Sequence, residues 1–211
     1  GVFGGGVAVN WAFVGASTIA GQYLASAIRA TGNCEVRWIV SGSADRAASF
    51  AKTHGITKSG GDLSTALADP AVGAVYISST NEKHHAQALA AFAAGKHVLC
   101  EKPLATKIAD AQDMVAAAER AGVVFATNHH LRSAGSLRAI RQLIADGKVG
   151  KVLSLRIFHA VELPVHLRGW RLDNPAAGGG VIADLTVHNA DTARFLLDED
   201  PVSVVAHMDA T

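Results

Sequence analysis

The hydrophobic positions of this chain follow two periods that alternate along its N-terminal part. Short apolar runs that end at a glycine or a polar residue are typical of buried strands, and they cover 11–14, 36–40, 74–78, 97–100 and 123–126. Segments with apolar positions one turn apart are typical of helices, and they cover 18–30, 45–54, 62–67, 82–94 and 108–121. This α/β alternation predicts a Rossmann fold over residues 11–127, with a doubly wound parallel sheet and helices on both faces.

The pattern changes near Asn128. We expect a helix over 136–145, a long extended segment over 151–159, a helix over 181–197 and a strand over 202–207. So few elements make a poor domain, so we expect residues 128–211 to be a truncated part of a second, substrate-binding α+β domain. The glycine-rich residues 1–10 predict a flexible leader, and the sequence is expected to be a fragment or a shortened gene product.

Composition narrows the class of protein. The 211 residues are 49% hydrophobic and 18% charged with a net charge of +1, which predicts no general attraction to nucleic acid or to an acidic membrane surface. No apolar run approaches the roughly 18 residues that span a bilayer. Cys34 and Cys100 match no metal-binding spacing, and Cys100 ends an apolar run, which predicts a buried thiol in a reducing cytoplasm.

A turn between the first strand and the first helix stands where dinucleotide-binding proteins carry their glycine-rich loop. Gly15 can make the tight turn, and the following helix N-terminus can face a pyrophosphate. Ser17 and Ala20 replace the second and third glycines, so the match alone is weak, and a plain strand-to-helix turn remains the alternative. The candidate cofactor-binding residues here are Gly15, Ser17, Thr18, Ile19 and Ala20.

The end of the second strand bears on the choice between NAD and NADP. An acidic residue there would bind the adenosine ribose of NAD, but the strand runs into Ser41 and Gly42. Ser41 and Arg46 instead suit a ribose 2′-phosphate, which favours NADP over NAD. Asp45 fits better as a first-turn helix residue. The alternative for Arg46 is a solvated helix charge.

Three residues suggest hydride transfer to or from a sugar-like carbonyl or alcohol. Lys102 follows a buried strand at the carboxyl edge of the sheet, where it can stabilise negative charge on a substrate oxygen. Asp184 and His188 lie one turn apart on a helix, and a histidine can donate a proton because its pKa is near neutrality. The alternatives are a surface lysine and a buried, hydrogen-bonded histidine. A metal site is the minor interpretation, because no third ligand has a convincing spacing.

Other polar clusters are less decisive. Residues that follow the strand over 74–78 either line the nicotinamide side or cap the next helix; they are Ser79, Thr80, Asn81 and His84. Residues 127–130 lie at another strand end. His159, Trp170 and Arg171 offer an imidazole, an aromatic face and a guanidinium for sugar contacts, whereas core packing of Trp170 and exposure of Arg171 are the alternatives.

Two signatures carry a resemblance to a known family. The stretch 94–104, which contains Glu101-Lys102-Pro103, and the triple-glycine helix start 178–188, which contains Asp184 and His188, resemble the glucose–fructose oxidoreductase, inositol dehydrogenase and MocA (Gfo/Idh/MocA) family. The stretches 15–20, 127–132, 158–161 and 169–172 are shared, in the same order, with a sugar reductase of that family. The likeness runs from about residue 11 to about residue 202.

The resemblance implies an NADPH-dependent reductase of an anhydro-keto-sugar, with an open antiparallel sheet in the substrate domain. It implies a reacting centre of Lys102, Asp184 and His188, with His188 as proton donor. It implies that the sugar and the cofactor's reactive end meet residues from both parts of the chain, namely Lys102, His159, Trp170, Arg171, Asp184 and His188. The resemblance assigns the rest of the cofactor cleft to residues 17–20, Ser41, Gly42, Arg46, residues 79–84, Glu101 and Asn128.

Two rival functions stay open from the sequence. One is a dehydrogenase or reductase of the same family that acts on another sugar or polyol. The other is a non-catalytic NAD(P)-binding regulatory module, since fold alone does not decide function. The residues leave open whether the protein is a monomer or a homo-oligomer.

Overall fold

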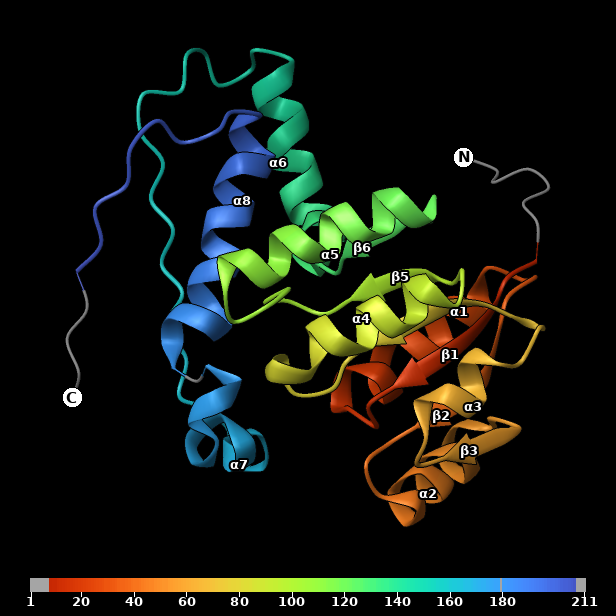
Figure 1. The fold of residues 1–211 in the computed structure, drawn as a ribbon. Coiled ribbons are helices and arrows are strands. Elements are labelled where there is room, and N and C mark those ends of the chain that lie inside the picture. The colour runs from red at the N-terminus through yellow and green to blue at the C-terminus, as the bar shows by residue number, and fades with distance from the viewer. Residues whose placement is uncertain (1–7, 179, 208–211) are drawn as a thin grey trace.

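The strand patterns of the N-terminal part combine into one parallel sheet. The computed structural model describes residues 8–178 and 180–207, and its six-stranded sheet has the order β3-β2-β1-β4-β5-β6 (Figure 1). The strands are β1 (Asn10–Val14), β2 (Glu35–Val40), β3 (Lys58–Gly60), β4 (Val72–Ile77), β5 (His97–Cys100) and β6 (Phe125–Thr127), all paired in parallel. The predicted Rossmann fold is confirmed, and the strand order reverses between β1 and β4, where such sheets bind their ligands.

Helices cover the two faces of the sheet because alternate strand residues point to opposite sides. Phe13 and Tyr76 pack towards α1 (Ala25–Ala30) and α2 (Ala44–His54). Val14, Val75 and Ile77 pack towards α3 (Leu63–Leu67), α4 (His84–Ala93) and α5 (Ile108–Ala121). Cys100 lies fully buried in this second cluster as a free thiol, as its place in an apolar run predicts. The two cores fix the strand ends, and the strand ends carry the site.

Some local predictions differ from the structure. Asn10, placed in the leader by the sequence, is the first residue of β1, and residues 1–7 of that leader lie outside the described residues. The first helix contains a π-helical turn at Ala20–Leu24 before α1. Strand β3 was missed because Lys58–Gly60 has no apolar run, and pairing with β2 together with ion pairs holds it. Its Lys58 ammonium lies 2.8 Å from the Asp69 carboxylate.

The chain after β6 is mostly helical. A 3-10 turn (His130–Ser133) leads into α6 (Gly135–Ala145), and α7 (Val165–Asp173) precedes a 3-10 turn (Pro175–Ala177), a π-helical turn (Ile182–Thr186) and α8 (Val187–Leu197). Helices α6 and α8 lie side by side (Figure 1). Helix α7 was not predicted, because Gly169 interrupts it with non-helical backbone angles and breaks its periodicity. Gly179, part of the triple glycine, lies outside the described residues.

Two segments lack the strand structure expected of them. Residues 202–207 form no strand, and Val202 and Val205 have relative exposures of 102% and 99%, so the predicted strand is wrong. Residues 151–159 run as an extended trace without sheet pairing in the described structure (Figure 1). The physical reason is common to both, since a strand needs a neighbour to pair its backbone groups, and neither has one among the described residues. None of the described helices is both long and apolar enough to cross a membrane.

Candidate active site

The carboxyl end of β5 meets the start of α8 through a lysine and an aspartate. Lys102, two residues after β5, places its Nζ 2.8 Å from Asp184 Oδ1 and 2.9 Å from the Asp184 carbonyl oxygen. The Lys102 side chain is only 12% exposed, and Asp184 comes from the π-helical turn that precedes α8. The ammonium group thus lies at the edge of the sheet where a parallel sheet binds ligands. The structure places Lys102 in the site, not in bulk solvent.

A second cation shares the Asp184 carboxylate. Arg171 Nε lies 3.3 Å from Asp184 Oδ2, and the Arg171 guanidinium stacks over the Trp170 ring at 4.6 Å from its centroid. Burial raises the pKa of Asp184, but Lys102 and Arg171 outweigh burial and lower it below its usual value. The carboxylate is therefore ionised at neutral pH and holds two cations. These three groups carry a net positive charge, which suits an oxygen that gains negative charge.

His188 lies at the centre of a group of imidazole rings. The ring of His188 is buried, and its centroid lies 5.1 Å from His130 and 6.3 Å from both His129 and His159. Burial first, then Lys102 and the neighbouring histidines, lower its pKa to about 4. The free protein therefore holds a neutral His188 at neutral pH. This corrects the expectation of a pKa near neutrality, because an isolated histidine lacks both the burial and the nearby ammonium.

Asp191 fastens α8 to the turn after β6, a role that the sequence did not reveal. Arg132 donates from Nε and Nη2 to both carboxylate oxygens of Asp191 at 2.6–3.0 Å. Asp191 is buried, and its Oδ2 lies 3.7 Å from His129 Nδ1. The position of Asp191, three residues after His188, was the available signal. It ties the catalytic helix and His129 to the nucleotide-binding half.

Glu101 and Asn128 face the interior rather than an open cleft. The Tyr76 hydroxyl and the Asn128 amide both donate to Glu101 Oε1 at 2.6 Å, and the Lys102 backbone N–H donates to Glu101 Oε2 at 3.3 Å. Burial and the Glu101 carboxylate raise the pKa of Tyr76 above its usual value. The expected cofactor contacts of the Glu101 and Asn128 side chains are not seen. They support the turn that carries Lys102.

His84 and Asn81 are also turned inward, which corrects their placement in the cleft. His84 is fully buried, with Nδ1 3.0 Å from the Pro103 carbonyl oxygen and Nε2 3.2 Å from the Ser79 carbonyl oxygen. Asn81 donates from Nδ2 to the Ala177 carbonyl oxygen at 2.8 Å. Backbone carbonyls occupy these polar groups, so both residues join loops and leave the nucleotide site to their neighbours.

The turn after β1 is held against the end of β4. Gly15 has a φ of +104°, and a Cβ atom there would lie 2.7 Å from the Ser78 backbone, so glycine is required. The Ser17 hydroxyl donates to Ser78 Oγ at 2.8 Å, and Ser17 Oγ accepts from the Ala20 N–H. Thr18 is exposed and Ile19 half-buried, whereas the Ala20 methyl group packs in the core. Only the backbone of Ala20 is free to face a pyrophosphate.

The expected adenosine side is assembled from several strand ends. Arg46 Nε donates to Ser41 Oγ at 3.0 Å, so the two residues that predict NADP lie together. A hollow at this edge is lined by Val14, Gly15, Val40, Ser41, Gly42, Gly61, Leu63, Ser79, Lys83 and Gln87. A Cβ atom at Gly42 would meet nothing within 4 Å, so the hollow is open there. This donor set and shape fit a dinucleotide.

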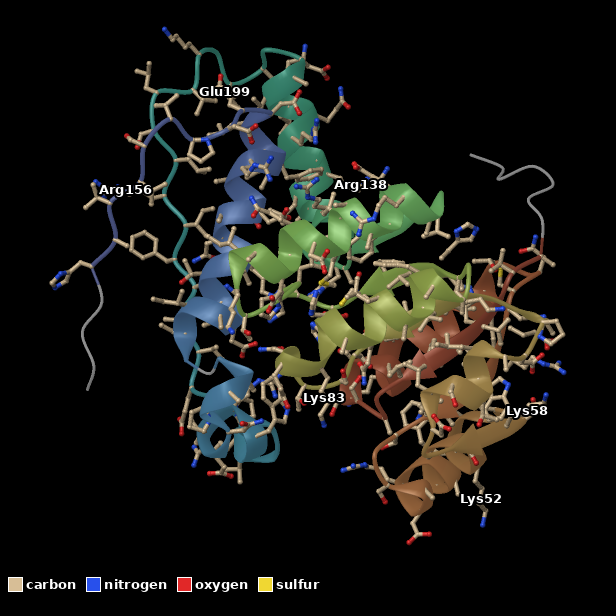
Figure 2. The ribbon with its side chains drawn as sticks, viewed as in Figure 1. Lys52, Lys58, Lys83, Arg138, Arg156 and Glu199 are labelled. Atoms are coloured by element: carbon tan, nitrogen blue, oxygen red, sulfur yellow. The ribbon has the colours of Figure 1, made fainter. Side chains whose placement is uncertain are left out.

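Sequence reasoning missed part of this lining. Leu63 begins α3, and Lys83 and Gln87 lie at the start of α4 (Figure 2 labels Lys83 there). Periodicity assigns Leu63 to the core, and no spacing rule singles out Lys83 or Gln87. Ser79 Oγ donates to Gln87 Oε1 at 2.6 Å, whereas Thr80 is turned to Glu82 at 2.7 Å. Of the predicted residues after β4, Ser79 alone lines the hollow.

His159 reaches the site from the extended segment. It is exposed, its Nδ1 lies 3.3 Å from Asn189 Oδ1, and its ring approaches His188. The structure therefore brings together Lys102, Asp184, His188, His159 and Arg171. Across residues 8–178 and 180–207, no group of three or more histidine, cysteine, aspartate or glutamate side chains is arranged to hold a metal ion.

Comparison with known families gives two matches along the chain. Residues 9–129 match the oxidoreductase family with an NAD-binding Rossmann fold (GFO_IDH_MocA). Residues 137–211 match the GFO/IDH/MocA C-terminal domain. The first match covers the parallel sheet, and the second covers α6 to α8.

Individual relatives are sugar-related oxidoreductases. A 1,5-anhydro-D-fructose reductase from Ensifer adhaerens is 56% identical over 197 residues, which are 93% of this chain and 59% of that protein. The structure of an aldose-aldose oxidoreductase from Caulobacter crescentus with glycerol is similar at a TM-score of 0.82 and 28% identity, covering 92% of this chain and 59% of that one. A levoglucosan dehydrogenase with NADH and levoglucosan is similar at a TM-score of 0.77 and 27% identity, covering 89% and 53%. The chain spans less than two thirds of each.

Proposed function

The chain belongs to the Gfo/Idh/MocA family of oxidoreductases, and we propose that the protein containing it reduces a ketone on a sugar with NADPH as the hydride donor. The observation that carries this proposal is the convergence of Lys102, Asp184 and His188 at the edge of the sheet, beside the strand ends that suit a dinucleotide. A non-catalytic NAD(P)-binding module would not need an ammonium, a carboxylate and an imidazole in contact there.

The residues have distinct parts in this reaction. NADPH, when bound, supplies a hydride to the carbonyl carbon and leaves as NADP+. Lys102 then holds the carbonyl oxygen and stabilises its developing negative charge. Asp184 keeps Lys102 in place through two hydrogen bonds and holds Arg171 on its other oxygen. Addition of one hydride and one proton converts the ketone to a secondary alcohol.

His188 donates the proton to the oxygen in this proposal. Its pKa of about 4 makes the neutral ring the resting form at neutral pH, so the protonated form is a small fraction of the free protein. The proposal therefore requires a reduction rate that rises towards acid pH. His130 and His159 approach the buried His188 from exposed positions, which gives its ring neighbours that exchange protons with solvent.

The substrate is proposed from the most informative relative. At 56% identity to a 1,5-anhydro-D-fructose reductase, we infer that the 2-keto group of 1,5-anhydro-D-fructose is reduced to 1,5-anhydro-D-mannitol. Trp170 offers a flat aromatic face, and His159 and Arg171 offer polar groups around the reacting centre. These residues come from α7 and the extended segment, so the second part of the chain selects the sugar.

NADPH is proposed over NADH because of the Ser41–Arg46 pair. A serine hydroxyl and a guanidinium in contact at the end of β2 suit a phosphate, and the described residues that line the adjoining hollow include no carboxylate to bind a ribose 2′-OH. The free thiols of Cys34 and Cys100 agree with a proposed cytoplasmic location.

The test is direct. Purified protein containing this chain is incubated with NADPH and 1,5-anhydro-D-fructose, while cofactor absorbance is followed and the product is identified by NMR. Consumption of NADPH with formation of the anhydro-alcohol supports the proposal. Turnover of another ketose or polyol without turnover of 1,5-anhydro-D-fructose would point to a different sugar. NADPH binding with no turnover of any sugar would point to a regulatory module.

A further inference from the structure

The hollow at the ends of β1 and β2 has two walls of different origin. Ser41 and Gly42 lie on one side, after β2, whereas Lys83 and Gln87 come from the start of α4 on the other. Gly61 contributes no side chain, and Leu63 contributes an aliphatic one. A cleft with an apolar wall, little steric obstruction and a few polar groups suits a planar heterocycle.

Gln87 is oriented with its hydrogen-bond donors unused. Ser79 Oγ donates to Gln87 Oε1 at 2.6 Å, which fixes the amide so that the nitrogen points elsewhere. Within residues 8–178 and 180–207, Gln87 Nε2 has no hydrogen-bond partner. A carboxamide that keeps two donors at a half-buried position matches the ring nitrogens of adenine, which accept hydrogen bonds.

Lys83 brings a second positive charge to this edge. It is exposed, and none of the described carboxylates forms an ion pair with it. The adjacent Glu82 is turned away, because its Oε1 accepts from Thr80 at 2.7 Å and from Asn174 at 3.2 Å. Lys83 is the one charged side chain among the described residues that line the hollow, while Arg46 is held behind Ser41.

We propose that this hollow is the adenosine subsite, that Gln87 binds the adenine ring, and that Lys83 and Arg46 bind the ribose 2′-phosphate from opposite sides. The inference rests on the proposed use of NADPH. A phosphate monoester carries close to two negative charges at neutral pH, so two cations neutralise it better than one. The guanidinium is fixed by Ser41, whereas the flexible lysine stem can reach across the opening.

The two roles have different signatures in binding. Affinities for NADPH, NADH, 2′,5′-ADP and 5′-AMP are measured by calorimetry on the protein containing this chain. Lys83→Met keeps the length of the stem and removes the charge, so we expect NADPH and 2′,5′-ADP to bind about five- to tenfold more weakly. NADH and 5′-AMP should change less than twofold. Gln87→Leu should weaken all four ligands to a similar degree, because all four contain adenine.

Matched variants separate charge from folding. Lys83→Arg keeps the charge and should retain most of the NADPH affinity. Lys52→Met removes an exposed lysine from the last turn of α2, far from the hollow in Figure 2, and should leave every affinity unchanged. Raising the salt concentration should reduce the difference between native protein and Lys83→Met, because exposed charges are screened.

Several results would overturn the inference. Equal weakening of NADPH and NADH by Lys83→Met would place the lysine at the pyrophosphate or in a structural role. Unchanged binding in Gln87→Leu would remove adenine from the hollow. A native protein with no preference for NADPH would remove both the 2′-phosphate role and the proposed cofactor choice. Selective loss of NADPH affinity in a protein that reduces no sugar would support the subsite and refute only the proposed reaction.

Discussion

The ammonium group of Lys102 contacts both the side chain and the backbone carbonyl of Asp184, at 2.8 and 2.9 Å. This pair joins the end of β5 to the helical segment that carries His188. The carboxylate stays ionised because Lys102 and Arg171 lower its pKa against the effect of burial. A single contact therefore holds the charge of the site and the relative position of its two halves.

Lys102→Met should abolish ketone reduction while the protein still binds NADPH. The variant removes the positive charge that stabilises the developing alkoxide, a loss that typically costs about 10²–10³ in rate. Steady-state kinetics and NADPH titration of the same preparation measure the two effects separately. Asp184→Asn is the companion variant, because it keeps the ammonium but weakens its placement. Normal turnover in Lys102→Met would exclude the lysine from the reaction.

His188→Ala should lower the reduction rate by about 10²–10⁴, which is the usual contribution of a proton donor. NADPH affinity should change little, because the hollow that we assign to adenosine is lined by other residues. Rapid-mixing kinetics with saturating NADPH give the rate, and calorimetry gives the affinity. Turnover equal to that of the native protein would remove His188 from the mechanism.

The pH profile tests the charge of His188. Only the protonated ring donates, and with a pKa of about 4 its fraction falls about tenfold per pH unit above that value. The value of kcat/KM should therefore fall with a slope near −1 between about pH 5 and pH 8, since kcat/KM reports the free protein. A flat profile over this range would show that another group supplies the proton.

Arg46→Ala should weaken NADPH much more than NADH. The guanidinium that donates to Ser41 is assigned to the 2′-phosphate, and losing a hydrogen bond to a charged group costs about 1.5–3 kcal/mol, or about 10- to 100-fold in affinity. Fluorescence or calorimetric titration with both nucleotides provides the comparison. Loss of the same size for both would refute the assignment.

Tyr76→Phe should destabilise the fold and slow catalysis. The Tyr76 hydroxyl donates to the buried Glu101 carboxylate at 2.6 Å, and a hydrogen bond to a charged group contributes about 1.5–3 kcal/mol to stability. Urea denaturation measures the free energy of unfolding. Because Phe keeps the aromatic contact with Phe13, the loss reports the hydroxyl. Unchanged stability would mean that Asn128 and Lys102 satisfy Glu101 alone.

The sequence by itself determined the parallel sheet. Apolar runs such as those of β1 and β4 and the helical spacing of α5 are local patterns, and alternation between them leaves few topologies. It also placed Lys102 at the carboxyl edge and put Asp184 and His188 one turn apart. It failed at β3 and at residues 202–207, where pairing with a neighbour, rather than the local pattern, decides the structure.

The tertiary structure alone decided which polar side chains share the site. Lys102 and Asp184 are 82 residues apart in the sequence, and no period relates them. Only packing shows that Glu101 and His84 face inward, that Lys83 and Gln87 line the hollow, and that Asp191 holds α8. The pKa of His188 follows from burial and neighbouring charge, which depend on all the segments that surround the ring. Local sequence sets the elements, whereas long-range contacts set their chemistry.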